Sequence, residues 1–145
     1  MSSILFQIKM GNGLALAIDK NNPGPGGQLI VMTANPGDAD QQWTWVYNPA
    51  SNASILYNPG RGLYAAPKSV KQGAPIVLNA LESHYNASQT FNVLGADGAA
   101  VQCAGDTDLN MNAFGDSWPS GTKVGLWGWS KGQQNEIWTS TVLNP

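Results

Sequence analysis

The same short pattern occurs three times along this chain of 145 residues. In each copy a turn glycine is followed by a short apolar strand, a polar loop and the motif Gln-x-aromatic, with Glu in place of Gln in the third copy. The glycines and rings that define the copies are Gly26 and Trp43, Gly73 and Phe91, and Gly121 and Trp138. One copy cannot bury its apolar face alone, so the copies must pack against one another. Because three copies take up nearly the whole chain, the repeat predicts a closed threefold assembly rather than an open array.

Each copy is expected to contain four short strands, since apolar runs alternate with clusters of Gly, Pro and Asn. The expected strands are 4–9, 14–18, 28–33 and 41–46, then 54–57, 63–66, 75–80 and 89–94, then 99–103, 108–112, 123–128 and 136–142. Twelve strands in threefold order can close a barrel with hairpins capping one end. We therefore expect one all-β domain over residues 1–145, with repeats at about 4–48, 54–95 and 99–142 and pseudo-threefold symmetry.

The composition argues against several classes of partner. Only 11% of the residues are charged and the formal net charge is −2, so no basic face is expected to neutralise the phosphates of a nucleic acid. The first residues lack the basic and then apolar pattern of a signal peptide, and no stretch approaches the roughly 18 apolar residues of a membrane span. We expect a cytoplasmic protein that does not insert into membranes, with secretion by a non-classical route left open.

No enzyme signature is found in the sequence. His84 is the only histidine and Cys103 the only cysteine, so neither a metal cluster of the Cys/His type nor an intrachain disulfide is expected. Cys103 ends an apolar run and is expected to be buried, which argues against a Cys/His nucleophile pair. We predict a protein that is not an enzyme and that needs no cofactor or metal.

A repeat of about 40–50 residues that ends in Gln-x-Trp and occurs three times resembles the ricin-type β-trefoil lectins. Among them the chain is most similar to the short stand-alone fungal or bacterial lectins, and the resemblance covers about residues 4–142. It implies a β-trefoil fold and non-covalent binding of galactose- or N-acetylgalactosamine-type glycans at shallow sites. β-Trefoils also include protease inhibitors and other protein-binding modules that act through an exposed loop, and loops 21–27 and 48–53 are the candidates for that alternative.

The repeated motif itself is interpreted as structural. Trp43, Phe91 and Trp138 are expected to fill the core around the threefold axis. Gln41 and Gln89 are expected to hydrogen-bond the backbone of the preceding loop. In the lectins that the chain resembles, this glutamine also orients a sugar-binding side chain. Glu136 departs from the pattern, because an ionised carboxylate accepts hydrogen bonds but cannot donate them.

A sugar site needs a flat ring for the C–H face of a pyranose and a carboxylate or amide for its hydroxyl groups. The resemblance places these groups on the second strand, six residues after the turn glycine and just before the Gln of the motif. In the third repeat these positions hold Asn112, Trp127 and Asn135, followed by Glu136. Asn112 stands where the related lectins have Asp. This repeat is predicted to carry the main site.

The first repeat has Ala17 at the acidic position and Met32 at the ring position, so the usual site is damaged there. The polar residues that could still form a pocket are Asp19, Asn35, Asp40 and Gln41. The alternative, that these are solvated loop residues, remains open. The second repeat has Ala66, Asn79 and Ser88 at the three positions and is expected to be mainly structural.

Two further expectations concern tryptophans of the third repeat. Trp127 and Trp129 flank Gly128, and one ring is expected to face inward and the other outward; the alternative is that both only cover the barrel. Trp118 lies in the loop Ser117-Trp118-Pro119, where a ring has no obvious core role. Exposed apolar residues near Trp118 suggest a possible homodimer.

Overall fold

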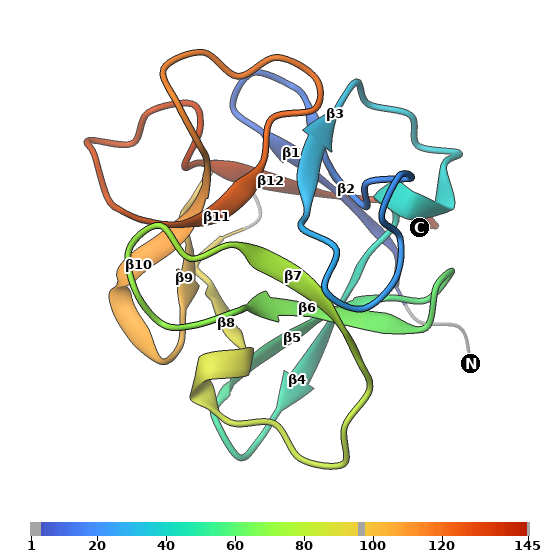
Figure 1. The fold of residues 1–145 in the computed structure, drawn as a ribbon, viewed down its shortest axis with the longest axis vertical. Helices are drawn as coiled ribbons and strands as arrows, with labels where there is room; N and C mark the ends of the chain where they lie inside the picture. The colour runs from blue at the N-terminus through green and yellow to red at the C-terminus, as the bar shows by residue number, and fades with distance from the viewer. Residues whose placement is uncertain (1–3, 96–97, 145) are drawn as a thin grey trace.

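The computed structural model describes residues 4–95 and 98–144, which form twelve strands and two short 3-10 helices (Figure 1). The strands of the first repeat are β1 Phe6–Met10, β2 Ala15–Ala17, β3 Ile30–Met32 and β4 Thr44–Asn48. Those of the second are β5 Ala53–Asn58, β6 Leu63–Pro67, β7 Ile76–Ala80 and β8 Phe91–Val93. Those of the third are β9 Val101–Cys103, β10 Asp106–Ala113, β11 Val124–Gly128 and β12 Trp138–Val142.

The first and last strands of every repeat form a closed barrel. The antiparallel pairs β12–β1, β4–β5, β5–β8 and β8–β9 supply four of its seams. The fifth joins Phe6 and Trp43, whose backbone groups exchange two hydrogen bonds of 2.7 and 2.9 Å, and the sixth joins Ala99 and Trp138. Closure leaves the barrel without a free edge, as the repeat predicts.

The two middle strands of each repeat form hairpins, β2–β3, β6–β7 and β10–β11, which meet around the threefold axis (Figure 1). Backbone bonds link them in a ring: Leu29 donates to Ile76, Val124 donates to Leu29, and Leu126 donates to Ala74. The repeated glycines explain how the hairpins come so close. Gly26, Gly73 and Gly121 all have φ between 87° and 97°, a conformation that favours glycine, and each donates its N–H to a carbonyl of a neighbouring repeat.

The core lies inside the barrel and under the hairpins, where Trp43, Phe91 and Trp138 are fully buried, as predicted. The indole N–H of Trp43 donates to the Leu16 carbonyl at 3.0 Å, and that of Trp138 donates to the Met111 carbonyl at 3.0 Å. Phe91 fills the same place in the second repeat without a donor. Cys103 is buried in the same core cluster, as expected.

The expected start of the last strand in each repeat was wrong. Gln41 ends the 3-10 helix Ala39–Gln41, Gln89 ends the 3-10 helix Ala87–Gln89, and Glu136 lies in a turn. The side chains of Asp38 and Asn86 cap these short helices by accepting from the backbone N–H two residues later. Such local bonds from Asp and Asn compete with strand formation. No helix among the described residues is long and apolar enough to cross a membrane.

Candidate functional site

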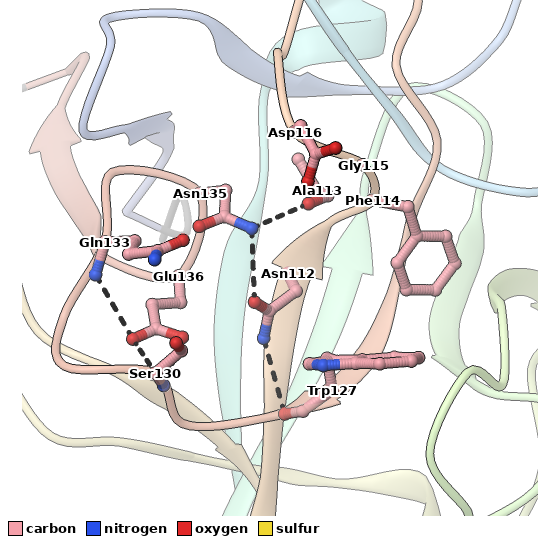
Figure 2. A pocket seen from close by; sticks show the side chains of 10 residues that line it. All are labelled: Asn112, Ala113, Phe114, Gly115, Asp116, Trp127, Ser130, Gln133, Asn135 and Glu136. Carbon is pink, nitrogen blue, oxygen red and sulfur yellow. Dashed lines mark hydrogen bonds between the residues drawn. The ribbon is translucent and has the colours of Figure 1, made fainter.

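The third repeat carries a cavity of about 340 Å³ between β10, β11 and the loops that follow them (Figure 2). Its walls are formed by Asn112, Ala113, Phe114, Gly115, Asp116, Trp127, Ser130, Gln133, Asn135 and Glu136. The structure therefore brings the four residues that the sequence singled out in this repeat around one cavity.

Trp127 presents its ring at one side of this cavity, with 46% of the residue exposed. Phe114 supports the ring edge-on, with centroids 6.4 Å apart and an interplanar angle of 71°. Phe114 itself lies over Gly125, where a Cβ atom would come within 2.2 Å of the Phe114 ring and 2.4 Å of the Ala74 carbonyl oxygen. Gly125 is thus the residue that makes room for the pair of rings.

Two amide side chains form the polar wall. The Asn112 amide nitrogen donates to the carbonyls of Asn110 at 3.0 Å and Trp127 at 3.4 Å. The Asn135 amide nitrogen donates to the Ala113 carbonyl at 2.9 Å and to the Asn112 Oδ1 at 3.5 Å (Figure 2). Because all these partners are acceptors, neither amide can be reversed.

The Oδ1 atom of Asn135 has no hydrogen-bond partner although it is buried, and it is the one such side-chain atom in the part of the chain that the structure describes. A buried polar atom without a partner costs roughly 1–3 kcal/mol, so native proteins rarely leave one unless it serves a purpose. Asn135 lines the cavity, and its Oδ1 is an unused acceptor buried in that wall.

Glu136 is 1% exposed and holds the loop beside the cavity. Its carboxylate accepts from the backbone N–H groups of Ser130 at 2.9 Å, Gly132 at 2.7 Å and Gln133 at 3.2 Å. All of these partners are donors, which explains why a carboxylate can replace the glutamine here. Its role in the structure is to fix the loop that carries Ser130 and Gln133.

A second cavity, of about 370 Å³, lies in the first repeat, with Ala17, Met32, Asp19 and Gln41 among its lining residues. Gln41 accepts from the Gln7 side chain and the Asn35 backbone and donates to the Thr33 carbonyl, so both acceptor sites of its oxygen and one of its two N–H donors are used. Asp19 accepts from the backbone N–H of Asn21 in a local turn.

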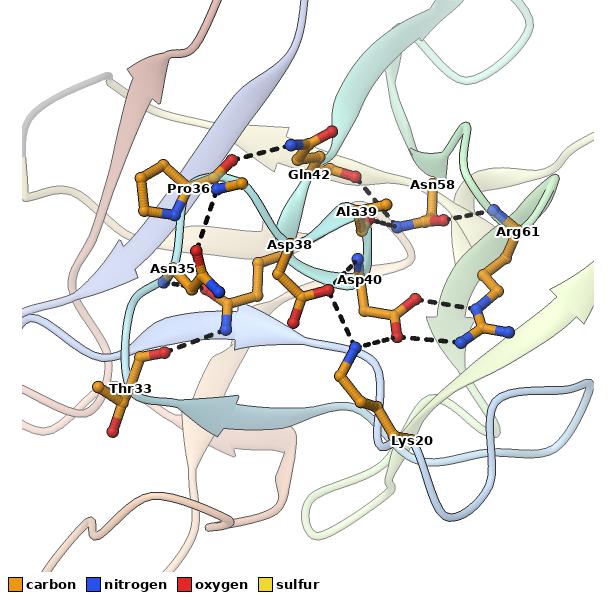
Figure 3. A network of polar contacts seen from close by, with 12 residues as sticks. Lys20, Thr33, Asn35, Pro36, Asp38, Ala39, Asp40, Gln42, Asn58 and Arg61 are labelled. Carbon is orange, nitrogen blue, oxygen red and sulfur yellow. Dashed lines mark hydrogen bonds and ion pairs between the residues drawn. The ribbon is translucent and has the colours of Figure 1, made fainter.

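Asn35 and Asp40 do not line this cavity. The Asn35 Oδ1 accepts from the Gly37 N–H within its own loop. Asp40 is buried and receives two hydrogen bonds from Arg61, at 2.8 and 3.0 Å, and one from Lys20 at 2.7 Å (Figure 3). The Arg61 hydrogen bonds lower the pKa of this carboxyl against the opposing effect of burial.

The second repeat uses its polar residues in an internal cluster. The Tyr64 hydroxyl donates to Glu82, and the Gln89 amide donates to the Tyr64 oxygen at 3.0 Å and to Glu82 at 2.6 Å. Burial first, and the Glu82 carboxylate next, raise the pKa of Tyr64 above its ordinary value. Tyr85 packs edge-on against the Tyr64 ring at 4.9 Å.

The sequence matches no described protein family and no curated protein. Its fold, however, matches solved structures along almost the whole chain. The Rhizoctonia solani agglutinin has a TM-score of 0.81 at 16% identity and covers 98% of this chain and 96% of its own. The designed threefold-symmetric protein ThreeFoil has a TM-score of 0.80 at 17% identity, covering 94% and 97%.

The chain is a β-trefoil. A third match is the Macrolepiota procera ricin B-like lectin in complex with lactose, with a TM-score of 0.74 at 18% identity and coverage of 97% and 96%. The structural resemblance to the ricin-type trefoil lectins that the repeats predict is therefore confirmed. At such identities the match concerns the fold, and the function has to be argued from the residues of this trefoil.

Two expectations about this trefoil were wrong. Trp127 and Trp129 are both about half exposed. Residues two apart on a strand face the same side, so opposite faces were not to be expected, and β11 in any case ends at Gly128. Trp118 does have a core role, because it packs against the main core cluster and its indole N–H donates to the Gly115 carbonyl.

Sequence reasoning also missed six of the ten lining residues, among them Phe114 and Asp116. Both lie in the loop after β10, outside the spacing that defines the repeat. The signal for Phe114 was Gly125, a glycine within the apolar strand segment of the repeat, which indicates a close approach by another group.

Proposed function

We propose that this protein is a carbohydrate-binding lectin without catalytic activity, and that its third repeat binds galactose- or N-acetylgalactosamine-type sugars. The observation that carries the proposal is the unpartnered Oδ1 of Asn135 in the wall of a cavity that also presents the Trp127 ring. A hydrogen-bond acceptor beside a flat apolar face is the combination that a pyranose recognises. The lactose complex of the Macrolepiota procera lectin, which has the same fold, supports a galactose-type ligand.

In this proposal the C–H face of the sugar stacks on Trp127, and one hydroxyl donates to Asn135 Oδ1. The Asn112 Oδ1 has only the long 3.5 Å bond from Asn135, so it can accept a second hydroxyl. Asp116 adds a carboxylate to the cavity wall, and no Lys or Arg is among the lining residues. Neutral sugars are therefore favoured over anionic ones, whose charge would face Asp116 without a cation.

One shallow site of this kind gives roughly millimolar binding, about −4 kcal/mol. Glycans on a surface are held more firmly when several sites bind together, since linked sites can add a factor of about 10²–10⁴. A homodimer would supply such linkage and remains part of the proposal.

The test compares glycan-array binding and calorimetric titration with galactose and N-acetylgalactosamine for the wild type, Trp127→Ala and Met32→Ala. Met32 is the position-matched control, because it occupies the ring position of the first repeat. We expect Trp127→Ala to weaken binding at least tenfold and Met32→Ala to leave it unchanged, with the sugars recovered intact by mass spectrometry. A folded wild type that binds no glycan, or one that cleaves it, would contradict the proposal.

A further inference from the structure

A third and larger cavity, of about 670 Å³, lies beside the site in the third repeat but shares none of its residues. It opens along β9 and β10 and is lined by Gln102, Thr107, Asp108, Asn110 and Trp129, with Leu94 and the segment Gly98, Ala99 and Ala100 opposite. We call it the Trp129 groove. It is not one of the positions that the repeat pattern marks for sugar binding.

Asn110 is a buried polar residue in the wall of this groove, at 2% exposure. No other described residue forms a hydrogen bond with its side-chain amide; only its backbone carbonyl is used, by Asn112. The Asn110 amide nitrogen and oxygen are not among the fully enclosed polar atoms, where Asn135 Oδ1 is the one described atom without a partner, so they are open to the groove and available to a ligand. The Gln102 amide, on the neighbouring strand, likewise has no partner among the residues described.

Trp129 supplies the apolar side of the groove, with half of the residue exposed. Its ring lies against Gly132, where an added Cβ atom would be 3.2 Å from the ring atom Cζ2. The N–H of Gly132 is itself held by Glu136 at 2.7 Å. The indole therefore rests on a loop that Glu136 has fixed, and it keeps a surface open to solvent for stacking.

The two cavities share one strand, β10. Asn110 lines the Trp129 groove and Asn112 lines the first cavity, and both lie on β10. Residues two apart on a strand face the same side, about 6.6 Å from one another. Trp127 and Trp129 are likewise two residues apart, on either side of Gly128, and Trp129 directly follows the end of β11. An amide and an indole thus recur in each cavity, spaced so that one extended ligand can use both.

We infer that the Trp129 groove is a second subsite, in which a further sugar ring of the same glycan stacks on Trp129 and is hydrogen-bonded by the Asn110 and Gln102 amides. This inference rests on the proposed sugar site at Trp127. It changes the ligand of the third repeat from a single terminal sugar to an oligosaccharide of at least two units. Asp108 and Thr107 at the rim accept and donate to hydroxyls, and the absence of Lys and Arg from the lining residues again favours neutral sugars.

The test uses the ¹⁵N–¹H NMR signals of the indole N–H groups, assigned with Trp127→Ala and Trp129→Ala. The full-length protein is titrated with N-acetylgalactosamine and then with the tightest-binding oligosaccharide from the array. We expect the monosaccharide to shift the Trp127 signal alone and the oligosaccharide to shift both. Trp129→Ala should weaken oligosaccharide binding at least fivefold and leave monosaccharide binding unchanged, with Tyr47→Ala as a control for an exposed ring outside both cavities.

Each failure has a different meaning. If no sugar shifts Trp127, the proposed function fails. If Trp127 responds but the best oligosaccharide leaves the Trp129 signal in place, the inference is overturned and the sugar site stands alone. The inference would also be overturned if Trp129→Ala weakened the binding of the monosaccharide and of the oligosaccharide equally. Should Trp129→Ala unfold, Gln102→Ala is used for the same comparison, with circular dichroism as the check on folding.

Discussion

The first and third repeats have nearly the same cavity but different chemistry. From Ala17 to Gln41 the first repeat corresponds residue by residue to the third, always 95 positions later, so that Ala17 matches Asn112 (112−17) and Asp40 matches Asn135. The two cavities measure about 370 and 340 Å³. The trefoil backbone therefore creates the hollow in both repeats, and the side chains decide whether the hollow is a site.

The difference is clearest at the pair Asp40 and Asn135. A buried carboxylate needs partners, and Asp40 takes three hydrogen bonds from Arg61 and Lys20 and does not line the cavity of its repeat. A neutral amide can stay buried with one unpartnered oxygen at a smaller cost, and Asn135 does so. Polar groups that the fold has not already used are what make the third repeat a candidate site.

Gly125→Ala should have the largest effect, because it should damage the cavity of the third repeat and leave that of the first repeat intact. The new Cβ would collide with the Phe114 ring and the Ala74 carbonyl, so we expect a loss of about 3 kcal/mol in the free energy of unfolding and of sugar binding. The matched change is Ile30→Val at the equivalent position of the first repeat, which should cost about 1 kcal/mol and spare binding. Urea denaturation and calorimetric titration measure both, and equal losses in the two variants would contradict the account.

Exchanging the motif residues Gln41 and Glu136 should destabilise the protein in either repeat. In Gln41→Glu a carboxylate would face the Thr33 carbonyl, to which the amide now donates. In Glu136→Gln an amide N–H₂ would face the donors Ser130, Gly132 and Gln133. We expect each change to cost about 2 kcal/mol in urea denaturation. A neutral result for Glu136→Gln would show that the carboxylate is not required to hold the loop.

The Asp40 ion pairs predict a pH dependence that Asn135 cannot have. The pKa of Asp40 is lowered from 3.8, so its stabilising contribution is present above that value and is lost as the pH falls through the lower folded-state value. Asp40→Asn should lower the free energy of unfolding by about 1 kcal/mol at pH 7, a modest figure because the Arg61 side chain is 39% exposed. Denaturation at a series of pH values should show the two proteins converging below pH 3.8. A difference that does not change with pH would refute the ion-pair explanation.

The smallest effect is expected for Met32→Trp, which tests whether a ring alone can turn the cavity of the first repeat into a sugar site. It places a ring in the first repeat where Trp127 stands in the third, but the cavity still has Ala17, and the Gln41 amide oxygen already accepts two hydrogen bonds. We expect the number of sugars bound per chain in calorimetric titration to stay at one. A second bound sugar would show that a ring alone is sufficient.

Much of the fold could be predicted from the sequence because its signals are local and repeated. A glycine at the same place in each copy predicted the tight hairpins, and the motif rings predicted the core. The short helices that end at Gln41 and Gln89 were missed, since their caps compete with the strand pattern that surrounds them.

The candidate site was only partly predictable. The positions that the resemblance to the ricin-type lectins implies, counted along the third repeat, are Asn112, Trp127 and Asn135, and all three line one cavity. The sequence could not show that Arg61, from the next repeat, forms hydrogen bonds with Asp40. Nor could it show that the Asn110 side-chain amide forms none with the described residues. Those facts depend on which partners the folded chain brings near each polar group, and no sequence interval records them.

The most direct test of the account is a crystal structure of the protein with galactose or N-acetylgalactosamine bound. It should show the sugar ring stacked on Trp127, with a hydroxyl within hydrogen-bonding distance of the Asn135 Oδ1 atom. A sugar bound in the cavity of the first repeat, with Asn135 Oδ1 still unpartnered, would contradict the claim that unused polar groups define the site.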